Sequence, residues 1–151
     1  MTMRNMSKIN KISPAVTSAN GVAGTTDIEG STIDMQGYES VLVIVTMGVI
    51  TGSAVTSIKM QQDSASGMGT AADLEGTGQT IADTDDGKIF YIDLHRPMER
   101  YVRLYVDRAT QNAVVASANY IQYNGGSLKA PVTHETSVSG EFHSEVAEGT
   151  A

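Results

Sequence analysis

An acidic loop, Asp83-Thr84-Asp85-Asp86-Gly87, carries side chains that could bind a metal ion. Three carboxylates within four residues offer oxygen ligands for a hard cation such as calcium. The glycine comes one position too early for an EF-hand loop, and Leu94 stands where that loop needs a bidentate glutamate. Aspartate and glycine are also what a tight strand connection uses. We therefore expect a structural turn and no cofactor, with a cation site as the alternative.

The residues that could form a catalytic site are scattered. The histidines His95, His134 and His143 lie far apart, and no serine stands in a Gly-x-Ser-x-Gly elbow. The chain has no cysteine, so thiol nucleophiles, zinc thiolates and disulfides are excluded. The glycine-rich segments 67–69 and 76–78 resemble parts of phosphate-binding loops, but neither precedes a credible helix. We therefore predict that the protein is not an enzyme.

Three arginines lie close together where two predicted strands are joined. Arg96 and Arg100 flank Pro97, which prevents continuous strand pairing, and Arg103 follows them. In an acidic chain these cations could pair with carboxylates of a neighbouring subunit. We take Arg96, Arg100 and Arg103 as candidate contacts to a partner, with a purely structural connection as the alternative.

Composition bounds the kind of protein and the kind of partner. With 151 residues, 40% hydrophobic and 18% charged, the chain is expected to form one soluble globular domain. A net charge of −7, with scattered Lys and Arg, argues against nucleic acid as the main partner. The longest apolar run, 41–50, is about half of what a membrane-spanning helix needs, and residues 1–10 lack an apolar signal segment. We expect no membrane partner.

Patterning divides the chain into a core between two arms. Residues 1–26 are rich in small and polar residues without a sustained period, which predicts an extended N-terminal arm that buries little of itself. Residues 27–126 contain the periodic apolar segments and are the predicted core. A turn signal at Asn124-Gly125-Gly126 precedes a polar C-terminal arm, residues 127–151.

Short apolar segments between turn signals predict strands. The run Val41-Leu42-Val43-Ile44-Val45 has no polar alternation, as expected for a central strand covered on both faces. Val102, Leu104 and Val106 share one parity and predict a half-buried strand. In the last strand, Val115, Ile121 and Tyr123 fall on one parity. The predicted strands are 32–35, 40–47, 57–62, 88–94, 101–108 and 113–123.

Many short strands with loops of Gly, Asp and Ser predict an all-β fold. Alternating faces need a second sheet to bury them, so we predict a single antiparallel β-sandwich, jelly-roll-like, or a small barrel. Helix is expected to be limited to one short turn, with 67–75 as the best candidate.

Three segments together resemble small structural proteins encoded in the head modules of tailed phages. They are 36–45 (QGYESVLVIV), 58–64 (IKMQQDS) and 93–103 (DLHRPMERYVR), and the resemblance covers about residues 30 to 125. It implies an all-β capsid decoration (cement) protein on the virion exterior, synthesised in the host cytoplasm. Such a protein binds the major capsid protein, often as a trimer, stabilises capsomer junctions and has no catalytic residues.

The sequence leaves two other functions open. A carbohydrate-binding β-sandwich could use Tyr91, Tyr101 or Tyr105 as a sugar platform. A hydrolase with an unrecognised site is the other alternative. Under the capsid hypothesis, Arg96, Arg100 and Arg103 become candidate subunit or capsid contacts.

Overall fold

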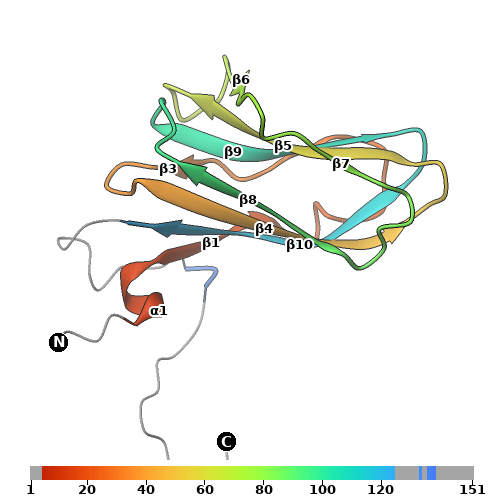
Figure 1. The fold of residues 1–151 in the computed structure, drawn as a ribbon, viewed down its shortest axis with the longest axis horizontal. Helices are drawn as coiled ribbons and strands as arrows, with labels where there is room; N and C mark the ends of the chain where they lie inside the picture. The colour runs from red at the N-terminus through yellow and green to blue at the C-terminus, as the bar shows by residue number, and fades with distance from the viewer. Residues whose placement is uncertain (1–4, 125–132, 134–135, 139–151) are drawn as a thin grey trace, which may run out of the picture.

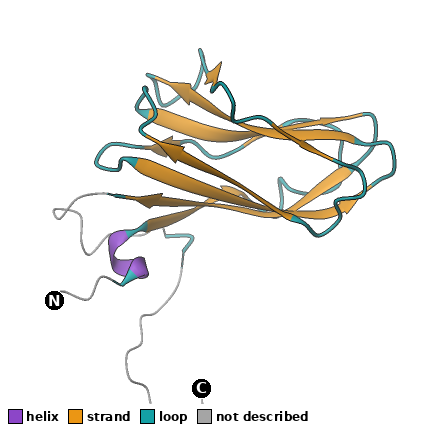
Figure 2. Cartoon of the chain, in the orientation of Figure 1, coloured by secondary structure: helices purple, strands orange, loops and turns teal. Residues whose placement is uncertain are grey.

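The protein forms two antiparallel β-sheets that pack face to face. The computed structural model describes residues 5–124, 133 and 136–138. One short helix, α1 (Met6–Ile9), lies beside the N-terminal strand (Figure 1). Strands dominate the rest of the described chain (Figure 2). They are β1 (Lys11–Val16), β2 (Ile28–Glu29), β3 (Ile33–Asp34), β4 (Ser40–Ile50), β5 (Val55–Asp63), β6 (Ala72–Asp73), β7 (Gln79–Ile81), β8 (Ile89–His95), β9 (Tyr101–Ala109) and β10 (Ala113–Tyr123).

The strand order is that of a jelly roll. One sheet has the order β1-β10-β4-β8, and the other has β2-β9-β5-β6, with β3 also on β9 and β7 also on β5. We count β2 and β3 as one interrupted strand, and likewise β6 and β7, which gives eight strands in chain order. The first of the eight pairs with the last, the second with the seventh, the third with the sixth and the fourth with the fifth. Such a long antiparallel hairpin rolled into two sheets is a jelly roll. The predicted all-β sandwich is confirmed, and the sheets do not close into a barrel.

The core lies between the two sheets and is built from alternating strand residues. Val102, Leu104 and Val106 of β9 are 0% exposed, as the period-two pattern predicts. Ile58 and Met60 of β5 are equally buried beside them. The facing side of β4 supplies Val41, Val43, Val45 and Met47. Burial of these branched and long side chains is the main source of stability.

The strand β4 is central in its sheet, as predicted, but is not fully covered on both faces. It lies between β10 and β8, and its odd-numbered valines enter the core. Leu42 and Ile44 point to the other side and are only half-buried. The unbroken apolar run therefore reflects one buried face and one partly open apolar face.

The N-terminal arm expected over residues 1–26 contains a core strand. Residues 11–16 form β1, which pairs with β10, and Ala15 and Val16 are 1% and 5% exposed. The period was hidden because two inward positions carry the small residues Ser13 and Ala15, and because Pro14 is unusual in a strand. The helix also differs: α1 lies in this segment, whereas 67–75 contains turns and β6. The expected C-terminal arm, 127–151, lies outside the described residues except for 133 and 136–138.

A register shift changes the parity of β10. The pairing with β4 shifts between Ala113 and Val115 and again between Val115 and Ser117. Such irregularities insert an extra residue and turn the following side chains to the opposite face. Tyr120 and Gln122 therefore enter the core, each 0% exposed. The expectation that Ile121 and Tyr123 share the face of Val115 was wrong for this reason.

Candidate functional site

The outer face of the four-stranded sheet carries a group of apolar side chains. Leu42 and Ile44 of β4 point away from the core. Leu42 is opposite Ile121 of β10, which in turn is opposite Ile12 of β1. Ile44 is opposite Tyr91 of β8. Cross-strand neighbours on one face are close enough to form a continuous surface. We call Ile12, Leu42, Ile44, Ile89, Tyr91 and Ile121 the apolar face.

The most open part of the apolar face is on β8. Ile89 and Tyr91 are 66% and 64% exposed, while the β4 side chains beside them are half-buried. Among the side chains opposite Leu42 and Ile44, Asp93 carries the only full charge. The hydroxyl of Tyr123 donates a hydrogen bond to the Asp93 carboxylate, and this bond raises the pKa of Tyr123. Large apolar side chains held open on a sheet mark a surface for another protein or ligand.

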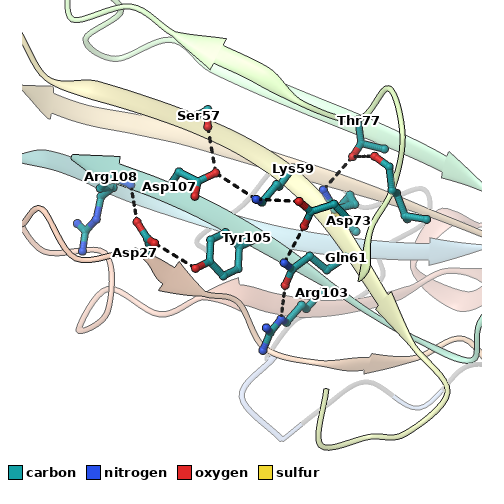
Figure 3. A network of polar contacts seen from close by, with 12 residues as sticks. Asp27, Ser57, Lys59, Gln61, Asp73, Thr77, Arg103, Tyr105, Asp107 and Arg108 are labelled. Carbon is teal, nitrogen blue, oxygen red and sulfur yellow. Dashed lines mark hydrogen bonds and ion pairs between the residues drawn. The ribbon is translucent and has the colours of Figure 1, made fainter. Parts of the chain in front are cut away.

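The outer face of the six-stranded sheet carries the opposite chemistry. Figure 3 shows a network of charged and polar side chains there. Lys59 Nζ lies 3.0 Å from Asp73 Oδ2 and 3.5 Å from Asp107 Oδ2. Gln61 donates to Asp73 at 2.8 Å and accepts from Arg103 Nε at 2.8 Å. These groups satisfy one another within the chain.

The network also shifts the pKa values of its members. The hydrogen bond from Gln61, followed by that from Lys59, lowers the pKa of Asp73. The hydrogen bond to Asp73 raises the pKa of Lys59. Partial burial, and then the hydrogen bond to Asp27, raises the pKa of the Tyr105 hydroxyl. These shifts favour the charged forms of Asp73 and Lys59 and the neutral form of Tyr105.

The three candidate arginines do not form one cluster. Arg103 is 9% exposed and bonds Gln61 and Glu29, the latter at 3.0 and 3.2 Å. Arg100 lies at one end of the sandwich and forms a two-point pair with Asp34 at 2.9 and 2.7 Å. All three arginines have a carboxylate partner in their own chain, since Arg96 also pairs with Glu39 at 3.3 Å.

The loop 96–100 borders an open hollow at the same end of the molecule. Its backbone is well held: Arg96 N–H donates to the Glu39 carbonyl at 2.7 Å, and the N–H groups of Met98 and Glu99 donate to Gln62 Oε1. The Met98 side chain is 91% exposed. The hollow is lined by Met35, Gln36, Tyr38, Glu39, Arg96, Pro97, Met98, Glu99 and Arg100.

The tyrosines proposed as a sugar platform differ in availability. Lys59 and Arg103 lie over the Tyr105 ring, 4.9 and 5.8 Å from its centroid. Arg100 lies 5.2 Å from the centroid of Tyr101. Tyr91 has no such cation among the described residues and is the most exposed of the three. A sugar platform would therefore be centred on Tyr91.

The acidic loop 83–87 is used to hold a strand connection. Asp86 Oδ1 accepts from Ile50 N–H at 2.6 Å, and Asp83 Oδ2 accepts from Ser53 N–H at 2.6 Å. Asp85 accepts from Ala82 N–H and pairs with Lys88. The bonds from Ile50 and Ser53 fix the connection between β4 and β5, and those to Asp85 close its own loop, as expected of a structural turn. Within the described residues, no group of three His, Asp or Glu side chains is placed to hold a metal ion.

The structure describes only part of the remaining sequence candidates. His95 Nδ1 lies 2.8 Å from Ser40 Oγ, whereas His134 and His143 are outside the described residues. The glycines at 76–78 flank Thr77, whose hydroxyl bonds the Leu74 carbonyl at 2.7 Å. No helix in the described part of the chain is long and apolar enough to cross a membrane.

Comparisons with family models, curated proteins and solved structures gave no match to this chain.

Sequence reasoning missed the apolar face. The signal was present in Leu42 and Ile44, which interrupt the valines of the run 41–45. We interpreted that run as a strand covered on both faces, because buried parallel strands have the same pattern. The order of the sheets shows that the outer side of β4 is open, since no further layer of described strands covers it.

Proposed function

We propose that this protein is a virion structural protein that binds the outer surface of a phage capsid and stabilises capsomer junctions. The observation that supports this most is the contrast between the sheets: one carries the apolar face, and the outer face of the other carries a self-satisfied polar network. An apolar sheet face suits a protein surface. The trimeric state and the location on the capsid exterior belong to the same proposal and rest on the resemblance in sequence.

The size of the apolar face favours a repeated partner. The whole outer face of the sheet, taken as seven residues of about 3.3 Å each across four strands about 4.8 Å apart, measures roughly 400 Å². The apolar face is part of this area. A stable interface of standard size buries about 800 Å² on each partner. One such face alone would bind weakly. Copies linked to one another, or contacts to two capsomers at a junction, would raise the apparent affinity through multivalency.

Fold and chemistry are compatible with this role. Jelly rolls occur in viral capsids and also in lectins, so the fold alone does not decide the function. Arg96, Arg100 and Met98 at the end of the sandwich remain candidate contacts, since their side chains are exposed next to the hollow. Arg103 is a weaker candidate because it is nearly buried in the polar network.

A matched pair of substitutions tests the capsid proposal. Ile89→Glu places a charge on the apolar face, and Val55→Glu places the same charge on β5 of the other sheet, where the native side chain is 60% exposed. Burying an unpaired carboxylate at an interface is costly, so we expect Ile89→Glu to reduce co-sedimentation with capsids that lack this protein by about tenfold or more. Val55→Glu should bind like the unmodified protein. Equal binding by both variants, with both folded, would contradict the proposal.

The carbohydrate-binding alternative depends on the open ring of Tyr91. Tyr91→Ala would remove that platform, and glycan-array binding that disappears in this variant would favour the alternative. Saturable capsid binding without glycan binding would favour the capsid role.

A further inference from the structure

The four edges of the two sheets are protected unequally. The edge strand β1 contains Pro14 and a register shift, and its Ala15 carbonyl accepts a bond from Ser31 N–H. The edges of the six-stranded sheet are broken into pieces of two or three residues: β2, β3, β6 and β7. Proline, irregularities and short strands are the usual means of preventing edge-to-edge association. β8 has none of these along its seven residues.

The backbone of β8 presents hydrogen-bonding groups to the open side. The Lys88 carbonyl accepts a hydrogen bond from Met47 N–H, so the backbone N–H and C=O groups of the even-numbered residues of this strand point toward β4. Odd-numbered residues therefore point their N–H and C=O groups outward. Consistent with this, the Tyr91 carbonyl accepts a bond from Gln79 Nε2 of β7 at 2.8 Å. Within the described residues, no strand pairs with this side of β8.

We propose that the open edge of β8 binds β8 of a second copy of this chain, in antiparallel orientation, to form a two-fold dimer with a continuous eight-stranded sheet. The pairing would replace the Gln79 bond with a backbone hydrogen bond and complete the outward groups of Ile89, Tyr91, Asp93 and His95. An extended strand is the partner that such an edge recognises.

Self-pairing is favoured over a foreign strand because the sequence of β8 is complementary to itself. When the two strands overlap fully, Tyr91 is opposite Asp93 of the second copy, and Ile89 is opposite His95. On the core side, Phe90 is opposite Leu94, and Ile92 is opposite its own equivalent. Within the strand no like charges are opposed. On the core side apolar side chains meet apolar side chains, whereas on the outer face Tyr91 meets the charged Asp93 and Ile89 meets His95.

Two further features agree with this register. Phe90 and Leu94 are only half-buried at the open side of the core, so a second copy would cover them. At the ends, Lys88 meets Arg96 of the other copy, but each already has a carboxylate in its own chain, Asp85 and Glu39.

Pairing would also join the apolar faces of two copies into one surface of about twice the area. The dimer stands independently of capsid binding and differs from the trimer that the resemblance implies.

Sedimentation of the full chain over a range of concentrations tests the dimer. We expect a monomer–dimer equilibrium. Tyr91→Pro removes an N–H group that points outward, so the monomer should stay folded while dimerisation weakens by about tenfold or more. Tyr91→Thr is the matched control: it removes the ring, keeps the N–H group and should dimerise better than the proline variant. A chain that stays monomeric at all concentrations, or a Tyr91→Pro variant that dimerises as well as Tyr91→Thr, would overturn the proposal.

Cysteine cross-linking tests the register directly, since the natural chain has no cysteine. In the full-overlap register, a mixture of the Tyr91→Cys and Asp93→Cys variants should form the mixed disulfide under mild oxidation, because directly opposed residues are about 5.5 Å apart at Cα. Each variant alone should cross-link poorly, because its cysteines would be diagonal neighbours. Preferential cross-linking of either variant with itself would reject this register. Failure of capsid binding in a protein that still dimerises would count against the proposed function only.

Discussion

Tyr120 joins the two sheets through its hydroxyl group. It extends from β10 across the core, is 0% exposed, and accepts a hydrogen bond of 2.6 Å from Leu104 N–H of β9. The bond falls where the sheet partner of β9 is interrupted between β2 and β3, and Gly30 N–H bonds the Leu104 carbonyl there at 2.8 Å. Burial raises the pKa of this hydroxyl, so it stays neutral. A side chain here completes a strand's hydrogen bonding.

Replacing Tyr120 by Phe tests this role. The ring still fills the core, but Leu104 N–H loses its acceptor, and a buried unsatisfied amide costs about 1–3 kcal/mol. We expect the free energy of unfolding, measured by urea denaturation, to fall by that amount. Tyr123→Phe is the control, because its hydroxyl bonds Asp93 at the surface, and its effect should stay within about 0.5 kcal/mol. Equal effects of the two variants would show that the bond across the sheets contributes little.

At the scale of elements, the strands that the sequence predicted correctly are the regular ones. β4, β5, β8 and β9 were predicted because they alternate or run apolar without interruption. β10 was placed correctly, but its bulge reversed the faces of its second half, and a single sequence gives no sign of where a bulge lies. β2, β6 and β7 are only two or three residues long, too short to show a period.

The candidate site was predictable only in part for the same reason. The side chains of the apolar face were visible as apolar residues in strands, but their exposure depends on which strands neighbour them and on which layers cover the sheet. The ion pairs of the candidate arginines also come from distant segments: Arg103 with Glu29 of β2, and Arg100 with Asp34 of β3. Sequence spacing alone does not reveal such partners.

Truncation at the N-terminus tests the reassigned strand β1. Removing residues 1–10 deletes α1 but leaves β1, whereas removing residues 1–16 also deletes the edge strand and exposes the core next to Ala15 and Val16. We expect the first truncation to change the unfolding temperature little and the second to destabilise the fold strongly. Thermal unfolding by circular dichroism measures both. Similar midpoints for the two truncations would mean that β1 is dispensable.

At the scale of the whole molecule, charge is distributed unequally between the two outer faces. The chain has a net charge of −7, and on the outer face of the four-stranded sheet Asp93 carries the only full charge opposite Leu42 and Ile44. The other sheet holds its ions in internal pairs. An acidic protein of this kind repels other copies at long range while keeping one face suited to close contact. The ion pairs are thus concentrated on one sheet, and the apolar face lies on the other.

The ionic interactions predict how stability depends on pH. Asp34, Asp63, Asp73 and Asp85 all have pKa values lowered below the usual 3.8. The principal donors are, in the same order, Arg100, the backbone N–H of Ala65, Gln61 and Lys88. Because folding lowers these pKa values, the carboxylates stabilise the protein above the unfolded value of 3.8, and this contribution is lost as the pH falls through the folded values.

Asp63→Asn isolates one of these contributions. The Asp63 carboxylate accepts bonds from Ala65 N–H at 3.0 Å and Thr70 N–H at 2.8 Å, and it holds the loop after β5. The neutral amide is a weaker acceptor, so we expect the variant to unfold at a lower temperature than the unmodified protein at pH 7. The difference should shrink as the pH falls below 3.8, because the native carboxylate then also becomes neutral. Glu39→Gln, at an exposed pair with Arg96, should show little difference at either pH. An Asp63→Asn difference that stays constant with pH would show that the side chain's shape, and not its charge, holds the loop.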